Sequence, residues 1–237
     1  MDLFSYLLGK QAGGGGGGNL QEKSVTITQN TTTNITPDEG YDGLSKVNVT
    51  TNVASDMSEY FVTQINSNIE GTSNAPIFLK KMPTVTIASN VQHLNYMFAS
   101  LPMQSLESIQ GFDTNITYCS WMFNYCEKLT SINTTGWNTS NVIDMSGMFS
   151  GCSSLQTLDL SGFDTSNVTN MTAMFRYCSS LTHLDIRNFT FKSGVSTNVM
   201  FASVPANCEI IVKSQTEKDF ILNIRSDFTN VKTVAEL

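Results

Sequence analysis

Basic residues are scarce in this chain of 237 residues, which has 13 Lys and Arg against 20 Asp and Glu and a formal net charge of −7. A protein that binds nucleic acid displaces counterions with a basic stripe, and the sequence contains no such stripe. An acidic protein is also a poor partner for an anionic membrane surface. The charge balance therefore argues against nucleic-acid binding and against binding to acidic lipid headgroups.

Long apolar runs are missing as well, since no segment approaches the roughly 20 apolar residues that a membrane-spanning helix needs. The N-terminal residues have no basic segment ahead of the apolar stretch Leu3–Leu8, which Ser5 interrupts, so they do not match a secretion signal. We therefore expect no membrane insertion. If the protein is found outside a cell, we expect it to arrive there by lysis, as part of a virus particle.

Histidine and cysteine are also few, with two histidines and five cysteines, and an odd number of cysteines cannot close a complete disulfide framework. The cysteine spacing matches no paired CxxC zinc pattern, and the acidic residues do not recur in the dense Asp-x-Asp pattern of a calcium loop. His183 precedes Asp185 by two residues, which favours a solvated strand face over a catalytic cluster. We expect no metal, no cofactor and no catalytic residue.

What the sequence does contain is a repeat. The dipeptide Met-Phe begins at Met97, Met122, Met148, Met174 and Met200, and the spacing is constant after a first interval that is one position shorter. A fixed period of about 20 to 50 residues is typical of solenoids. A single unit of this kind cannot bury its own apolar face, so neighbouring units must stack to form a continuous core.

Equivalent positions of the repeat carry similar residues. In a parallel stack such positions form ladders about 4.8 Å apart, and we expect the apolar ladders to point inward. The Met-Phe column and the cysteines at Cys126, Cys152 and Cys178 are interpreted as core packing. The other apolar columns are Leu129, Leu155 and Leu181; Ile132, Leu158 and Leu184; and Trp137, Phe163 and Phe189.

Composition divides the chain into four regions. Residues 1–18 are an apolar leader followed by a tether of six glycines. Residues 19–55 alternate in the manner of β-strands and form a small module, which is marginal alone and is expected to serve attachment or oligomerisation. Residues 56–212 hold an N-terminal capping unit, in which Asp56 begins a short helix, and the repeats.

Residues 213–237 are interpreted as a C-terminal cap. Ser214 and Glu217 have the spacing of a capping box, which predicts the start of a helix. Phe220, Ile221, Ile224 and Phe228 fall on one face of that helix and are expected to cover the open end of the core. A closing strand is expected at residues 230–234. Within the repeats, the segments 138–140 and 164–166 suit turns, because their side chains can bond nearby backbone amides.

The segment MFSGCSSLQTLDLSGFDTSNVTNM, which begins at Met148, closely resembles the bacterial surface protein repeat of the BspA-like leucine-rich repeat family. The resemblance extends from roughly Pro83 to Val212. It implies a right-handed leucine-rich-type solenoid with a role in adhesion or binding. The predicted fold is therefore mainly β, with about five stacked coils and a C-terminal capping helix after a small β module.

The N-terminal segment LLGKQAGGGGGG, followed by a β module that contains Tyr41-Asp42-Gly43-Leu44, resembles structural proteins of phages and prophages of Gram-positive gut bacteria. This resemblance implies a virion appendage of the tail-fibre or head-fibre type. Its N-terminal region would bind other virion proteins and its repeats would project. Phage fibres are often trimers, so a homotrimer is one expectation.

Candidate ligand-binding residues lie on the strand that each repeat is expected to form. In the third repeat, Thr157, Asp159 and Ser161 alternate outward, and equivalent polar residues flank them in the neighbouring repeats. The result is a flat polar face that suits sugars or polar protein surfaces, although a merely solvated face has the same pattern. The candidate residues are Asn133, Thr135, Thr157, Asp159, Ser161, His183, Asp185 and Arg187.

The sequence therefore predicts a protein of the phage particle that recognises a host-surface glycan or protein through its repeats. The alternative is a bacterial cell-surface adhesin of the BspA-like family. A third hypothesis, a glycan hydrolase, needs two carboxylates that face each other across a cleft, and the regular repeat offers no obvious pair. We therefore expect no enzymatic activity.

Overall fold

The computed structural model describes most of the repeats and the C-terminal region. The leader and glycine tether at residues 1–18, and the short helix expected after Asp56, lie outside the described residues. Described are residues 24–28, 46–50, 81–82, 84–87, 91–100, 103–106, 108–113 and 115–237.

The described strands are short and pair in parallel, in three sheets. Parallel pairing requires a long connection between neighbouring strands, which here is the rest of each repeat. The sheets contain, in spatial order, β1 (Ser24–Thr28), β2 (Lys46–Thr50), β4 (Thr84–Ile87) and β6 (Ile109–Gln110); β3 (Lys81–Met82), β5 (Ser105–Leu106) and β7 (Ser131–Ile132); and β8 (Thr157–Asp159), β9 (His183–Asp185), β10 (Glu209–Val212) and β11 (Val231–Thr233).

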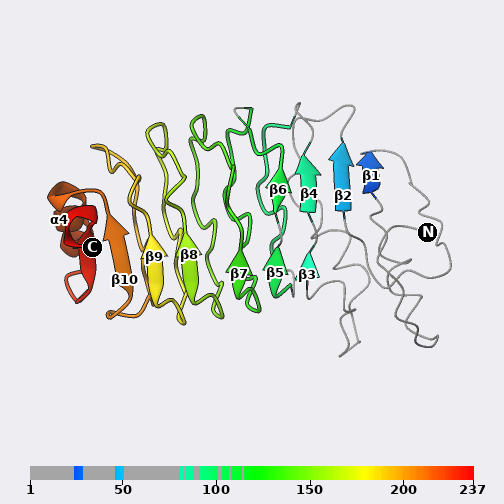
Figure 1. Ribbon diagram of the computed structural model, residues 1–237. Coiled ribbons are helices and arrows are strands. Elements are labelled where there is room, and N and C mark those ends of the chain that lie inside the picture. The colour runs from blue at the N-terminus through cyan, green and yellow to red at the C-terminus, as the bar shows by residue number, and fades with distance from the viewer. Residues whose placement is uncertain are drawn as a thin grey trace, which may run out of the picture.

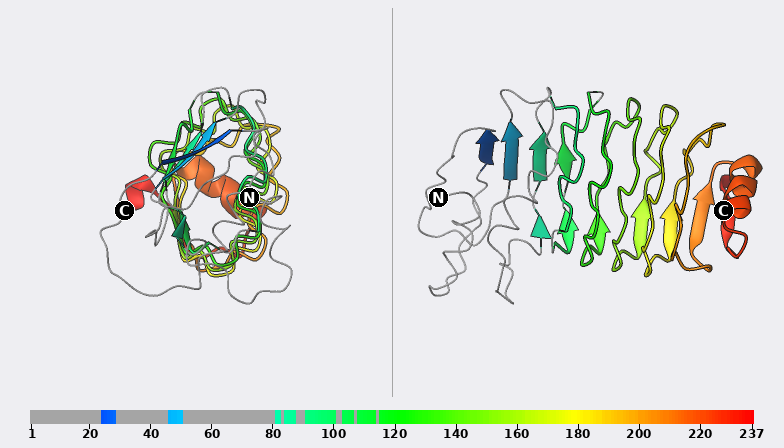
Figure 2. Two further views of the ribbon diagram at one scale, coloured as in Figure 1. Left: turned by 90° about the vertical axis from the view of Figure 1, so that its right-hand side faces the viewer. Right: turned by 180° about the vertical axis from the view of Figure 1, so that it is seen from behind.

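Successive turns of the chain lie side by side along one axis, in the order of the sequence, from β4 to β10 (Figure 1). Seen along that axis, the turns overlay one another in a common outline, as Figure 2 shows. Helix α4 (Gln215–Ile224) lies at the C-terminal end of the stack. Within the described residues, no helix is both long and apolar enough to cross a membrane.

The repeat positions that the sequence aligns are the positions that pair. Leu158 of β8 lies beside Leu184 of β9, which lies beside Ile210 of β10, so the chain returns to the same place after each repeat. This register turns each column of the sequence into a ladder in space. On another side of each turn, single parallel bridges join His93, Tyr118, Asp144, Asn170 and Ser196, in that order.

The core consists of these ladders. Leu129, Leu155 and Leu181 are fully buried, as predicted, whereas Ile132 of β7 is only half-buried. Two aromatic ladders run through the core with neighbouring ring centroids 4.7 to 6.5 Å apart, in the range of offset stacking. They comprise Phe98, Phe123, Phe149, Phe175 and Phe201, and Phe112, Trp137, Phe163 and Phe189.

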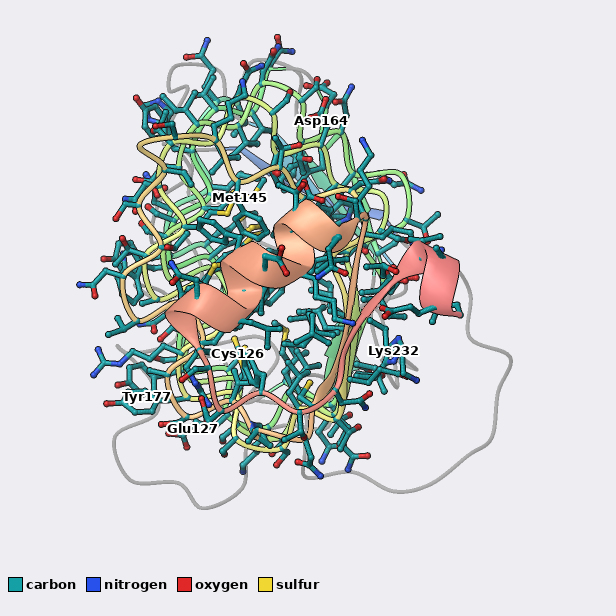
Figure 3. The ribbon with its side chains drawn as sticks, turned by 90° about the vertical axis from the view of Figure 1, so that its left-hand side faces the viewer. Cys126, Glu127, Met145, Asp164, Tyr177 and Lys232 are labelled. Atoms are coloured by element: carbon teal, nitrogen blue, oxygen red, sulfur yellow. The ribbon has the colours of Figure 1, made fainter. Side chains whose placement is uncertain are left out.

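The cysteine column is buried beside the first aromatic ladder, which confirms its interpretation as core packing. The thiol of Cys152 donates a hydrogen bond to the carbonyl oxygen of Phe123 in the preceding turn, with 3.3 Å between sulfur and oxygen. The thiol of Cys178 does the same to Phe149 at 3.1 Å. Each thiol therefore satisfies a backbone group and also fills the core. Figure 3 shows Cys126 and Met145 inside the cross-section and Asp164 and Lys232 outside it.

Asparagine and aspartate side chains form the corners of each turn. Each accepts a hydrogen bond from the backbone amide two residues later, at 2.7 to 3.1 Å, and so fixes a tight turn. The turns expected at residues 138–140 and 164–166 are confirmed. The pairs are Asp113 with Asn115, Asn133 with Thr135, Asn138 with Ser140, Asp144 with Ser146, Asp159 with Ser161, Asp164 with Ser166, Asn170 with Thr172, and Asp185 with Arg187.

At two further columns of the repeat, the backbone lies in the left-handed region of φ and ψ. They occupy the position before each Met-Phe pair and the position three residues after its methionine, with φ between 49° and 78°. Glycine adopts this conformation freely, whereas a residue with a Cβ is strained in it. The first column is Tyr96, Trp121, Gly147, Ala173 and Val199; the second is Ser100, Tyr125, Gly151, Tyr177 and Ser203.

The predicted small β module does not stand apart in the part of it that is described. β2 pairs with β4, with Val47 beside Val85, and β1 pairs with β2. The strands expected to need another copy or another protein therefore find a partner within the chain. β1 and β2 belong to one sheet with β4 and with β6, which is part of the repeats.

The C-terminal cap has the predicted helix and the predicted closing strand, β11. The capping box expected at Ser214 and Glu217 is wrong in detail: the Ser214 hydroxyl accepts from the Thr216 amide and donates to the Glu217 carboxylate. A reciprocal capping box forms instead at the 3-10 helix η1 (Val234–Glu236), whose N-cap is Thr233. Within α4, Ile221 is buried against the last turn.

Candidate functional site

The outward side chains of β8, β9 and β10 form one face, which we call the strand face. Its first row runs from Thr157 to His183 to Glu209, and its second row runs from Asp159 to Asp185. The register brings the predicted residues of the third and fourth repeats next to each other, because each occupies the same position of its turn. The strand face is therefore a continuous polar surface over these two repeats.

The first row ends in a charged cluster. His183 Nδ1 lies 2.8 Å from Glu209 Oε2, and Lys232 Nζ lies 2.6 Å from Glu209 Oε1. The hydrogen bond from Lys232 makes the largest contribution to lowering the pKa of Glu209, and the hydrogen bond from His183 lowers this pKa further. The carboxylate is therefore ionised at neutral pH. Glu209 and Lys232 were not predicted. The signal for Glu209 was available, since it lies one full repeat after His183 and so falls in its column.

The second row has a structural role. Asp159 and Asp185 of this row, and Asn133 at the equivalent position one repeat earlier, each accept a hydrogen bond from the backbone amide two residues later, at 2.8, 3.1 and 3.0 Å. These side chains close the turn that follows each strand. Part of the hydrogen-bonding capacity of the row is therefore committed to the protein's own backbone.

Asp185 departs from the prediction of an exposed face, because it is only 4% exposed. The guanidinium of Arg187 covers it, with Nε 3.0 and 2.9 Å from the two carboxylate oxygens. On its other side it lies beside Ile211 of β10, which is itself buried. The hydrogen bonds that Arg187 donates to the Asp185 carboxylate raise the pKa of Arg187, and the pair closes the strand face toward its C-terminal end.

The eight predicted residues consequently differ in what they offer a ligand. The more exposed part lies toward the N-terminus, and the ion-paired part lies toward the C-terminus. Such a face can exchange hydrogen bonds with a polar ligand over several turns. Asn133, Thr135, Thr157 and Asp159 are exposed; Ser161, His183 and Arg187 are half-buried; and Asp185 is buried.

The described part of the chain contains no group of three or more His, Cys, Asp or Glu side chains placed to hold a metal ion. The cysteines are unsuited for a different reason. Burial raises the pKa of the Cys178 thiol to about 12, and a thiol must lose its proton to bind metal or attack a substrate.

A second surface was missed in the sequence. Tyr125 and Tyr177 are 48% and 39% exposed, and both lie in the second left-handed column. The Met-Phe pairs point to the core, whereas these residues two positions after each Phe point outward. The signal that would have revealed them is an aromatic residue at a repeat position where the neighbouring repeat has Gly151.

Residues 92–213, which are more than half of the chain, match the family described as Mycoplasma protein of unknown function, DUF285. The chain belongs to this family. No curated protein and no solved structure matches it.

The stretch shared with the DUF285 family contains all eight predicted ligand residues and also Glu209. It ends just after β10, so α4 and β11, with Lys232, lie beyond it. The strand face is therefore mainly a feature of the family segment, while the cation at the end of its first row comes from the C-terminal cap.

Proposed function

We propose that this protein is a non-enzymatic adhesion scaffold: a leucine-rich-type solenoid whose strand face binds a polar surface on a host cell. The observation that carries the proposal is the shared register of the polar rows. Thr157, His183 and Glu209 stand on adjacent paired strands, over a core that fixes the backbone beneath them. Side chains held about 4.8 Å apart on a rigid support can meet a repeating or extended partner at several points.

Binding accounts for these side chains better than catalysis does. The carboxylates of Glu209 and Asp185 are each held by a cation, and Asp159 accepts a backbone amide. A general acid needs a proton to donate near neutral pH, whereas a neighbouring cation keeps a carboxylate ionised. Paired charges and hydroxyls on a flat face suit recognition of sugars or polar protein surfaces.

The setting we propose is a phage particle, with this protein as a tail-fibre or head-fibre type appendage. Support comes from the resemblance of the N-terminal sequence, with its glycine tether, to phage and prophage structural proteins. The N-terminal region would then bind virion proteins and the repeats would project. The BspA-like repeat sequence supports the alternative, an adhesin on the surface of a bacterium.

The strand face is tested with the full chain, labelled with a fluorophore, on candidate host cells. Thr157→Lys places a bulky charge in the middle of the face, and we expect it to lower cell binding at least tenfold. Thr169→Lys is the matched control, because Thr169 is also exposed but lies in the bridge segment on another side of the turn. Equal binding by the two variants would exclude the strand face as the binding surface.

The setting is tested by immunogold electron microscopy of an induced lysate, with antibody against the repeats. Gold on the heads or tails of particles supports the virion appendage. Gold on cell envelopes, with bare particles, supports the adhesin instead.

A further inference from the structure

Four aromatic residues occupy positions in the two left-handed columns, and we call them together the aromatic face: Tyr96 and Trp121, which are half-buried, and Tyr125 and Tyr177, which are exposed. Tyr177 lies outside the cross-section, across the core from Lys232 of the strand-face cluster (Figure 3). The aromatic face and the strand face are therefore separate surfaces of the same stack.

The backbone makes the choice of residues on this face unusual. Tyr125 and Tyr177 have φ of 54° and 63°, a region that strains any residue with a Cβ and is rare for bulky ones. The intervening turn has Gly151 at the same position, where no such strain arises. Large side chains at strained positions on a surface need a reason other than folding, and strain of this kind is concentrated at binding sites.

Glycines hold two of the rings in place. A Cβ on Gly151 would lie 2.8 Å from Tyr125 Cδ1, and a Cβ on Gly147 would lie 2.1 Å from Trp121 Cε3. Each of these two aromatic side chains therefore rests on the glycine that lies one repeat later. Tyr96 stacks on Trp121 from the other side, with ring centroids 6.3 Å apart and planes 8° from parallel. The rings are consequently preorganised rather than free to rotate.

Arg176 supplies a charge at one end of the face. Its guanidinium lies 4.4 Å from the centre of the Tyr177 ring and donates to the Tyr177 hydroxyl at 2.6 Å. Arg187 and Arg225 each form an ion pair with an aspartate, whereas among the described arginines Arg176 forms no ion pair with a carboxylate. A guanidinium fixed beside an aromatic ring is a suitable partner for a ligand carboxylate.

We propose that the aromatic face binds an extended β-linked polysaccharide that carries uronic acid residues. Tyr125 and Tyr177 lie two turns apart. At the spacing between neighbouring strands this is roughly 10 Å, which is of the order of the length of one disaccharide unit in such a polymer. The apolar faces of sugar rings pack on aromatic side chains, and Arg176 pairs with the uronate carboxylate. This site is independent of the proposed strand-face function.

The fluorescence of Trp121 provides the measurement, because Trp137, the other tryptophan, is buried in the core. The full chain is titrated with a hyaluronan decasaccharide, whose disaccharide unit holds one glucuronate, and with neutral chitohexaose. We expect saturable binding of hyaluronan, at least tenfold tighter than that of chitohexaose. The double variant Tyr125→Ala/Tyr177→Ala should bind at least tenfold more weakly, and Arg176→Gln should abolish the preference for the acidic sugar.

Thr169→Lys, which is exposed and lies outside both the strand face and the two left-handed columns, serves as the control and should bind hyaluronan like the unaltered chain. Far-ultraviolet circular dichroism and the unfolding midpoint establish that each variant is folded. Absence of saturable hyaluronan binding by the unaltered chain would overturn the proposal, and so would full binding by the folded double tyrosine variant. Neither result would bear on the strand face, which the cell-binding comparison tests separately.

Discussion

The indole ring of Trp121 lies against Gly147 of the next turn, so closely that a Cβ on the glycine would be 2.1 Å from Cε3 of the ring. Gly147 also has φ of +59°. We predict that Gly147→Ala lowers the free energy of unfolding by more than about 2 kcal/mol, because it adds left-handed strain and displaces the ring. Urea denaturation measures this loss, and Trp121 fluorescence should change at the same time.

Two other glycines separate strain from steric overlap. Gly136 has φ of +82° but open space around it, so Gly136→Ala should cost only the strain, about 1 to 2 kcal/mol. Gly162 has open space and lies outside the left-handed region, so Gly162→Ala should leave stability within about 1 kcal/mol of the original, with a gain favoured. A loss at Gly147 no greater than at Gly136 would contradict the contact between ring and glycine.

The core could be predicted from the sequence because one period governs it. Leu158 and Leu184 stand one repeat apart in the sequence and side by side in space, so the alignment of repeats is also the alignment of strands. The turns could be predicted from the local sequence as well, since Asp164 accepts a hydrogen bond from the Ser166 amide, as its position in the sequence suggests. In both cases the determining interaction joins equivalent or neighbouring residues.

Predictions failed where a repeat position changes its chemical character from one turn to the next, or where the backbone conformation and exposure decide the role of a residue. Asp185 was expected to be exposed, but Arg187 folds over it and the apolar Ile211 occupies its column in the next turn. Tyr177 was missed because its importance depends on backbone φ and on exposure, neither of which a residue pattern states. Those are the features that distinguish the candidate surfaces from the repeating core.

The phenylalanine ladder predicts where the stack is most sensitive to truncation. Phe149 is fully buried and stacks between Phe123 and Phe175, at 5.5 and 6.3 Å between ring centroids. Phe149→Ala should lower the free energy of unfolding by about 3 to 5 kcal/mol, because it leaves a cavity in the ladder. Tyr177→Ala, at the surface, should change it by about 0.5 kcal/mol or less. Similar losses in the two variants, measured by urea denaturation, would contradict the ladder as the main source of stability.

The buried thiols predict a loss of stability in alkali. Burial raises the pKa of Cys178 and of Cys208 to about 12, above the ordinary value of 9.0 that an unfolded chain would show. Below pH 9 the thiols are protonated in both the folded and the unfolded state, so their contribution to the free energy of unfolding is fully present. As the pH rises above 9, the unfolded state loses these protons first, so the free energy of unfolding falls.

Denaturation curves at several pH values between 8 and 11 measure this effect, and Cys178→Ala should show a shallower alkaline slope than the unaltered chain. In the native state at pH 8, all five cysteines should resist a thiol reagent and become reactive in denaturant. Rapid native labelling of Cys178 would contradict its burial.

The C-terminal cap predicts a separate sensitivity to acid. Lys218 of α4 donates to both carboxylate oxygens of Glu236, at 2.8 and 3.0 Å, and the Thr233 amide donates at 2.6 Å. The hydrogen bond from Lys218 and then that from Thr233 lower the pKa of Glu236 from 4.5 to about 2. The stabilisation is therefore fully present above pH 4.5 and is lost as the pH falls toward 2.

Because Glu236 is exposed, we expect a small effect on global stability and a larger one on opening of the cap. Hydrogen exchange of the α4 amides, measured from pH 6 down to pH 3 and corrected for intrinsic rates, should show loss of protection before the β8 and β9 amides do. Glu236→Gln should lower the protection of α4 at pH 6 and remove most of its pH dependence, whereas Glu127→Gln, an exposed acid on the repeats, should not. Equal acid sensitivity of α4 in the unaltered chain and in Glu236→Gln would show that the pair with Lys218 does not hold the cap, and would leave the packing of Ile221 as its main support.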